Sequence, residues 1–173
     1  MAESSIEQLA AAAHYVIATA DGHDLGKTKL NKILWFADCA AWRSHGRTIT
    51  GLKEYIKLQY GPVPPRIDMA LSILAQQRLA ESIDQYVGPY VRFGYRSLVE
   101  PRADNYLSTE DRKILDSVIE AVRPMTAFDV SEISHDALWH STPYGQRIAV
   151  AAAAVQHTPP DERIREWARS VRR

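Results

Sequence analysis

Apolar residues recur every three or four positions in three stretches of the chain, which cover about residues 6–20, 30–41 and 67–74. This spacing places apolar side chains on one face of an α-helix. We therefore predict three helices. The second run is the most apolar, and it ends at His45-Gly46, where glycine can terminate a helix. We expect that helix at the centre of the core.

The period changes to two between residues 52 and 60, where apolar and polar side chains alternate. Alternation of this kind is typical of a strand with one face in water. Two more alternating runs, 83–87 and 91–95, flank the turn formers Gly88-Pro89 and predict a hairpin. We expect the hairpin to join the first strand in one antiparallel sheet.

The C-terminal half returns to helical spacing. Ser108 is a suitable cap for a helix that Pro124 would end, and further helices are expected over 126–138, 144–156 and 160–172. The predicted fold class is α+β, a mostly α-helical single domain with a small three-stranded antiparallel sheet. Residues 1–157 would form the domain, and residues 158–173 a C-terminal helix that packs on it or extends it.

Composition supports one globular domain: the 173 residues are 46% hydrophobic and 24% charged. Lys plus Arg (21) balance Asp plus Glu (21), which argues against a dedicated nucleic-acid binder. The single cysteine excludes an internal disulfide and fits a reducing cytoplasm. No leader and no apolar run of about 18 residues is found, so neither secretion nor a membrane span is expected.

Two motifs suggest chemistry that their context does not support. Gly22 and Gly26, followed by Lys27-Thr28, resemble a P-loop, but three residues rather than four separate the glycines and a helical pattern precedes them. Ser134-His135-Asp136 has the residue types of a hydrolase triad, yet neighbours on a helix point about 100° apart. We therefore expect a turn at the first motif and no catalytic relay at the second.

The remaining candidate groups indicate no cofactor and no metal. The histidines lack the spacing of a two-histidine zinc pair. Cys39 lies in the apolar run WFADCAAW, where a buried small side chain is expected rather than a reactive thiolate. Asp38, in the same run, is expected at the rim of the core beside a cation, because a buried carboxylate needs partners.

Residues 59–65 read QYGPVPP, with one glycine and three prolines in seven residues. Prolines restrict φ and push the preceding residue out of the α region. We expect a stiff, extended exit from the strand, with Pro64 or Pro65 in the first turn of the next helix. Two interpretations remain open: a turn that only serves the fold, or a rigid ridge that a partner binds.

Two motifs and a C-terminal signature carry a family resemblance. LNKILW at residues 30–35 and YGPVPP at residues 60–65 are similar to the "LxKLLY" helix and "YGPVxP" corner of the Panacea domain family, the SocA-like antitoxins. Ser134-His135, followed by a tryptophan, is similar to the family's C-terminal signature. The resemblance covers about residues 5–150. The matched or adjoining site residues are Lys29, Leu30, Lys32, Leu34, Trp35, Tyr60, Gly61, Pro62, Val63, Pro64, His135 and Trp139.

The resemblance implies a cytoplasmic, non-enzymatic antitoxin of a toxin-antitoxin system, with a link to phage defence. Its partner would be a cognate toxin encoded by the adjacent gene, and some members are expected to deliver the toxin to a protease. We expect surface residues around Lys29, Lys32, Tyr60, Val63 and His135 to form the partner site. Homo-oligomerisation is left open.

Two other classes remain as alternatives. The first is a nucleic-acid-binding or phage-associated regulator that uses the lysines at the start of the second helix or the arginines near the C-terminus. The second is an enzyme with a base and a nucleophile that converge near His135. The first alternative requires a basic surface, and the second requires a pocket.

Overall fold

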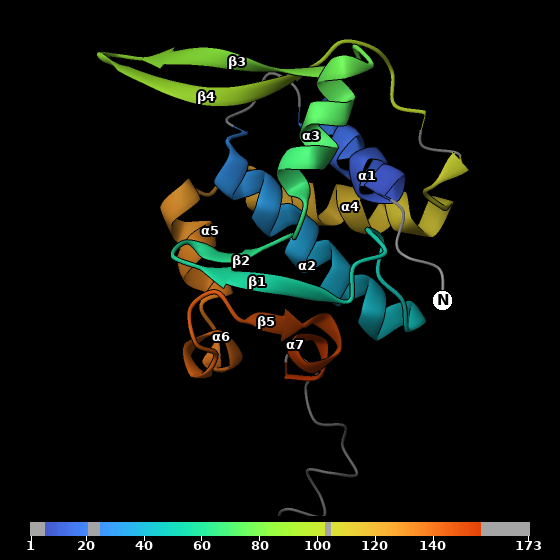
Figure 1. Cartoon of the computed structure of the whole chain (residues 1–173), viewed down its shortest axis with the longest axis vertical. Helices are drawn as coiled ribbons and strands as arrows, with labels where there is room; N and C mark the ends of the chain where they lie inside the picture. The colour runs from blue at the N-terminus through green and yellow to red at the C-terminus, as the bar shows by residue number, and fades with distance from the viewer. Residues whose placement is uncertain (1–5, 21–24, 103–104, 157–173) are drawn as a thin grey trace, which may run out of the picture.

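A computed structural model describes residues 6–20, 25–102 and 105–156 (Figure 1). The predicted helix over residues 158–173 lies outside the described residues, as do residues 22–24 of the P-loop-like segment.

The long helix α2 (Lys27–His45) runs through the middle of the molecule, as its apolar pattern predicts (Figure 1). It contacts α1 (Ile6–Thr19) and α4 (Thr109–Val122) on one side. It also contacts α5 (Ala127–Ser134) and α7 (Val150–Gln156). The central position of α2 in the core is therefore confirmed.

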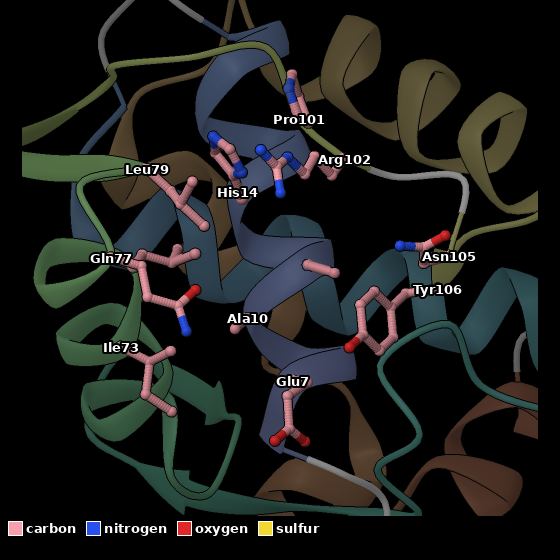
Figure 2. A pocket seen from close by; sticks show the side chains of 12 residues that line it. Glu7, Ala10, His14, Ile73, Gln77, Leu79, Pro101, Arg102, Asn105 and Tyr106 are labelled. Carbon is pink, nitrogen blue, oxygen red and sulfur yellow. The ribbon is translucent and has the colours of Figure 1, made fainter.

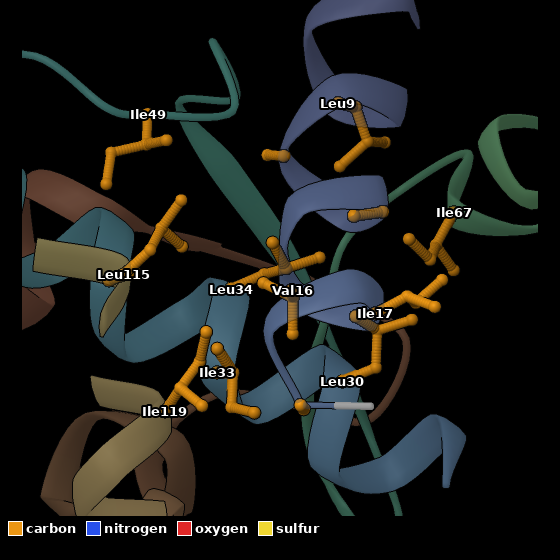
Figure 3. Close-up of a cluster of buried hydrophobic side chains, with 14 of the residues drawn as sticks. Leu9, Val16, Ile17, Leu30, Ile33, Leu34, Ile49, Ile67, Leu115 and Ile119 are labelled. Atoms are coloured by element: carbon orange, nitrogen blue, oxygen red, sulfur yellow. The ribbon is translucent and has the colours of Figure 1, made fainter. Parts of the chain in front are cut away.

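The larger hydrophobic core lies between α1, α2, α4 and α3 (Ile67–Gln76), and Figure 3 shows its aliphatic side chains. Ala12 and Ala13 on α1 are fully buried. Their small side chains let α1 pack closely against α2 and α3. A smaller cluster around Trp35 and Tyr55 joins α2 to the C-terminal elements. Within the described residues, no helix has both the length and the apolar character needed to cross a bilayer.

The three-stranded sheet has the order β2-β1-β5, with both pairs antiparallel. β1 (Glu54–Leu58) is the central strand, between β2 (Gly61–Val63) and β5 (Arg147–Ala149). The predicted fold class is thus confirmed, but the predicted membership of the sheet is wrong.

The predicted hairpin forms a sheet of its own. β3 (Ala80–Val87) and β4 (Tyr90–Ser97) pair with each other across Gly88-Pro89 and extend beyond the helices (Figure 1). The alternation of side chains predicts a strand but not its neighbour, because pairing depends on segments that are far apart in sequence. The outer positions of the core sheet belong to β2 and β5 instead.

The corner at residues 59–65 also differs from the prediction. The chain turns at Gln59-Tyr60, and residues 61–63 fold back as β2, with Leu58 opposite Gly61. Pro64 and Pro65 precede α3 rather than start it, since the helix begins at Ile67 after Arg66 in the left-handed conformation (φ 65°). The prolines therefore shape the approach to α3 and not its first turn.

Two predicted C-terminal helices are each divided. The helix expected over residues 126–138 becomes α5 and a short α6 (Ala137–Ser141), because the Asp136 carboxylate accepts a hydrogen bond from the Trp139 amide and starts a new helix. The helix expected over residues 144–156 becomes β5 followed by α7. Three residues are too few to show a period, so the sequence pattern could not separate β5 from the helix.

Helix ends that have strong local signals agree with the prediction. Gly46 closes α2 with φ 68° and donates its amide hydrogen to the Trp42 carbonyl. Ser108 opens α4 in a capping box with Asp111. These ends depend on contacts within a few residues, which is why the sequence alone predicts them.

Candidate functional site

Several residues of the family motifs, among them Lys32, Gly61 and Pro62, meet at one contact between α2, the β1–β2 hairpin and α5. Lys32 extends from α2, and its Nζ donates a hydrogen bond of 2.7 Å to the carbonyl oxygen of Pro62. The Lys32 side chain is only 1% exposed. We name this contact the signature joint and define it by Lys32, Tyr60, Gly61, Pro62, Ser131 and Ser134.

Gly61 lets the three elements of the signature joint approach one another. Its backbone φ angle is +109°, a value that residues with a Cβ rarely adopt. A Cβ at this position would lie 2.2 Å from the Ser134 Oγ and 2.6 Å from the Lys32 Cε. Any larger residue would therefore push α5 or the lysine away from the hairpin.

Two serines on α5 complete the joint. The Ser131 hydroxyl donates a hydrogen bond of 2.7 Å to the carbonyl oxygen of Tyr60. The Ser134 hydroxyl donates one of 2.6 Å to the Ser131 carbonyl oxygen. Since buried carbonyl groups need donors, α2 and α5 both supply hydrogen bonds to the short hairpin and hold it in place.

Burial lowers the pKa of Lys32 to about 7. Its amino group has one carbonyl acceptor and no carboxylate partner among the described residues. Removal from water destabilises the charged form of a lysine. The joint thus holds an amino group that loses its proton at a lower pH than an ordinary lysine does.

A stack of rings lies beside the joint. The His135 ring packs on Trp139 with centroids 3.7 Å apart and planes at 13°, and the Lys57 Nζ lies 4.0 Å from the centroid of the Trp139 ring. Burial lowers the pKa of His135, although the carboxylate of Glu132 opposes this effect. His135 Nε2 and Trp139 Nε1 are buried and have no hydrogen-bond partner within the described residues.

The triad-like residues 134–136 make three unrelated contacts. The Ser134 hydroxyl bonds to a backbone carbonyl, His135 stacks on Trp139, and Asp136 caps α6. No hydrogen bond joins the serine to the histidine in the described structure. The serine and the histidine therefore lack the hydrogen bond through which such a relay would begin.

Asp38 lies inside the core and not at its rim, so the expected position beside a cation is wrong. Its carboxylate accepts four hydrogen bonds, from the amides of Ile49 and Thr50, the Thr50 hydroxyl (2.5 Å) and the Tyr55 hydroxyl (2.7 Å). Burial raises the pKa of Asp38 to about 6, and the hydrogen bonds oppose the rise. Hydroxyl and amide donors replace the cation that the sequence suggested.

The structure also contradicts the predicted exposure of two lysines. Lys29 is 4% exposed, and its Nζ donates to the carbonyl of Arg123 at 3.3 Å, while Lys32 is buried in the joint. Their aliphatic stems pack in the core and their amino groups reach carbonyls. Neither lysine is available as part of a surface.

The other predicted site residues differ in how far they are buried. Leu30, Leu34 and Trp35 belong to the core, and Pro64 is buried beside the joint. Val63 is half-buried, as are His135 and Trp139. Tyr60 is exposed, so most of the motif surface that another molecule could touch lies at this residue and at the ring stack.

The sequence analysis missed the most exposed aromatic surface. Tyr86, Tyr90 and Phe93 on the β3–β4 hairpin are 78%, 74% and 71% exposed. We name residues 84–93 the aromatic arm. The signal was present in the sequence, because a tyrosine lies on each side of the turn at Gly88-Pro89. Since the hairpin lies outside the core sheet, Tyr86, Tyr90 and Phe93 are left in water.

No metal centre is found in the part of the chain that the structure describes, where no three His, Cys, Asp or Glu side chains gather closely enough to hold an ion. Cys39 is buried, and burial raises the pKa of its thiol to about 12. The cysteine is thus an inert core residue, as expected.

The fold and the signature joint define a small α+β domain in which a buried lysine and a glycine clamp a short hairpin between two helices. Residues 30–140 match the family model described as "Antitoxin SocA-like, Panacea domain". The chain belongs to the SocA-like Panacea domain family. No curated protein and no solved structure matches the chain. The resemblance inferred from the two motifs is confirmed.

Proposed function

We propose that the protein is an antitoxin that neutralises a cognate toxin by direct protein contact and catalyses no reaction. The observation that carries this proposal is the burial of the family motifs in the signature joint. Lys32, Gly61 and Pro62 are buried, and their contacts hold the β1–β2 hairpin against α2 and α5. What the family has in common is then a scaffold, and its exposed elements bind the partner.

The aromatic arm is the surface that fits such a partner best. It extends beyond the helices (Figure 1). Among the described residues each of its strands has one unpaired edge, which can accept a strand from another protein. Exposed aromatic side chains anchor protein interfaces at small entropic cost, and a stable interface needs about 800 Å² from each partner. Tyr86, Tyr90 and Phe93 supply such anchors.

The test is co-expression with the product of the adjacent gene. We expect that product to arrest growth alone, and we expect this chain to relieve the arrest and to co-purify with it. The double variant Tyr86→Ser/Tyr90→Ser should lose both rescue and co-purification while its thermal unfolding stays unchanged. Tyr144→Ser, which alters an equally exposed tyrosine away from the arm, serves as the matched control.

Two outcomes would contradict parts of the proposal. A toxic neighbour that this chain does not relieve would count against the antitoxin function. Rescue that survives the arm variant but not Tyr144→Ser would move the partner surface away from the arm.

Faster loss of the toxin in a protease-competent strain than in a protease-deficient strain would indicate delivery to a protease rather than a simple block.

The alternative of a nucleic-acid regulator has lost two of the three lysines at the start of α2. Lys29 and Lys32 are buried, so they cannot contact phosphates, and the exposed Lys27 is paired with Asp68. The C-terminal arginines lie outside the described residues. Binding that weakens steeply with salt would support that alternative, because phosphate contacts release counterions. Toxin binding through the aromatic arm should change little between low and moderate salt.

A further inference from the structure

A cleft of about 470 Å³ lies between α1, α3 and residues 101–102 and 105–106, on parts of the chain that take no part in the signature joint (Figure 2). Helix α1 forms its floor, where Ala10 and Ala11 leave room because their side chains are small. Ile73 and Leu79 line one wall. The volume is in the range of sites that hold a small molecule or a few side chains of a peptide.

The two ends of the cleft carry opposite charges. Arg102 lies at one end, next to His14, and Glu7 lies at the other end (Figure 2). His14 is 3% exposed, its Nε2 lies 3.0 Å from the Ser97 Oγ, and burial lowers its pKa. Since the histidine is neutral at physiological pH, Arg102 and Glu7 are the fixed charges of the cleft.

Two side-chain amides face the cleft from opposite walls, Gln77 at the end of α3 and Asn105 in the segment before α4 (Figure 2). Each amide can donate and accept hydrogen bonds. In the described structure neither amide has a side-chain hydrogen bond, and Arg102 and Glu7 have no ion pair. The polar groups of the cleft are therefore available to a ligand.

We propose that this cleft binds an extended peptide segment of another protein, in which an apolar residue lies between an acidic and a basic residue. The acidic side chain would pair with Arg102 and the basic one with Glu7. The apolar side chain would rest on Ala10 and Ala11, and the peptide backbone would bond to Gln77 and Asn105.

The chemistry of the cleft selects a peptide over other ligands. A nucleic acid or an anionic membrane would place negative charge against Glu7, which is unfavourable. A purely apolar ligand would leave both charges and both amides without partners as they lose water. A peptide offers a donor and an acceptor at each residue, together with side chains of either sign.

The test uses the full chain and three blocked tripeptides: acetyl-Glu-Leu-Lys-amide, acetyl-Glu-Leu-Glu-amide and acetyl-Lys-Leu-Lys-amide. Binding is followed by the amide chemical shifts of the ¹⁵N-labelled protein. We expect the mixed peptide to bind most tightly and to shift the amides of Ala10, Ala11 and Gln77. Ala11→Phe, which fills the cleft at a half-buried position, should abolish these shifts.

Reversing the charge of Arg102 should change which of the three peptides binds most tightly, and not only how tightly they bind. Arg102→Glu should weaken the mixed peptide about fivefold to tenfold, the effect of roughly one charge-assisted hydrogen bond, and should favour the Lys-Leu-Lys peptide. Arg43→Glu, which makes the same charge change at an exposed position on α2, should leave the preference unaltered.

Equal binding of all three peptides, shifts at other residues, or binding that Ala11→Phe leaves intact would each overturn the proposal. The same holds if no peptide binds. Because the peptides are tested without any toxin, such results leave the outcome of the rescue experiment unaffected. The two proposals can therefore fail separately.

Discussion

Gly61 determines how closely α2 and α5 approach the β1–β2 hairpin. Gly61→Ala adds a Cβ that would lie 2.2 Å from the Ser134 Oγ, at a φ of +109°. Strain at positive φ and overpacking each cost about 1–3 kcal/mol. We expect a loss of about 2–4 kcal/mol in the free energy of unfolding, measured by urea denaturation.

Gly46→Ala is the matched control, because Gly46 also has positive φ but no atom within 4 Å of its added Cβ. That variant should lose only about 1–2 kcal/mol, the cost of a left-handed residue. The double variant Gly61→Ala/Ser134→Ala should recover part of the loss. Equal losses for Gly61→Ala and Gly46→Ala would show that the close approach in the joint has no energetic importance.

The Tyr55 hydroxyl donates a hydrogen bond to the buried Asp38 carboxylate, so we expect it to contribute to the free energy of unfolding. Tyr55→Phe removes a donor at 2.7 Å, and a hydrogen bond to a charged group contributes about 1.5–3 kcal/mol. The folded-state pKa of Asp38 is about 6, above its ordinary value, so the ionised form that needs the donor prevails above pH 6. We expect the destabilisation to be larger near pH 7.5 than near pH 5, by chemical denaturation.

Tyr15→Phe tests whether burial causes this effect. The Tyr15 hydroxyl also donates to a carboxylate, that of Asp116 at 2.8 Å, but this pair is exposed. Exposed contacts contribute about 0–1 kcal/mol, so Tyr15→Phe should cost less and should show little dependence on pH. Similar losses in both tyrosine variants would contradict the account of Asp38.

Lys32 joins α2 to the β1–β2 hairpin. Lys32→Met leaves the Pro62 carbonyl without a donor, which costs about 1–3 kcal/mol. The folded-state pKa of Lys32 is about 7 and the unfolded value is higher. Between about pH 7 and pH 10 the unfolded state binds more protons, so the wild type should gain stability relative to Lys32→Met as pH rises.

Urea denaturation near pH 7 and near pH 9.5 measures this difference, and hydrogen exchange at β2 shows whether the hairpin loosens. Lys113→Met, at an exposed position on α4, is the control and should show neither effect. A gap between wild type and Lys32→Met that narrows as pH rises would contradict the assigned burial of Lys32.

The aromatic arm is an element that the core does not need. Asp84 and Phe93 are opposite each other in the register of β3 and β4, so residues 85–92 can be replaced by Asn-Gly, a two-residue hairpin turn. The shortened chain should unfold within about 1 kcal/mol of the wild type, because Tyr86, Tyr90 and Val91 are exposed and exposed side chains contribute little to stability. It should no longer co-purify with the proposed toxin partner.

The buried thiol of Cys39 reports on the cooperative unfolding of the protein. The thiol is buried between α2 and the C-terminal elements, and burial raises its pKa to about 12. A thiol reagent should therefore modify the native protein only at the rate of global unfolding. Cys39→Ser/Ser117→Cys, which moves the thiol to an exposed position on α4, should react at once. Fast modification of native Cys39 would show that this part of the core opens locally.

Local signals let the sequence predict the course of α2, the capping box at Ser108, the hairpin around Gly88-Pro89 and the family. Each of these depends on residues close together in the chain, whose backbone preferences act without the rest of the fold. The motif residues were likewise found from the sequence, although their arrangement in a buried joint was not.

Only the tertiary structure decided which strands pair and which charged residues are buried. β5 joins β1 across about ninety residues, and Lys29, Lys32 and Asp38 enter the core because distant carbonyl, amide and hydroxyl groups meet them there. Burial of a polar side chain depends on partners that folding brings together. No pattern within a short stretch of residues contains that information.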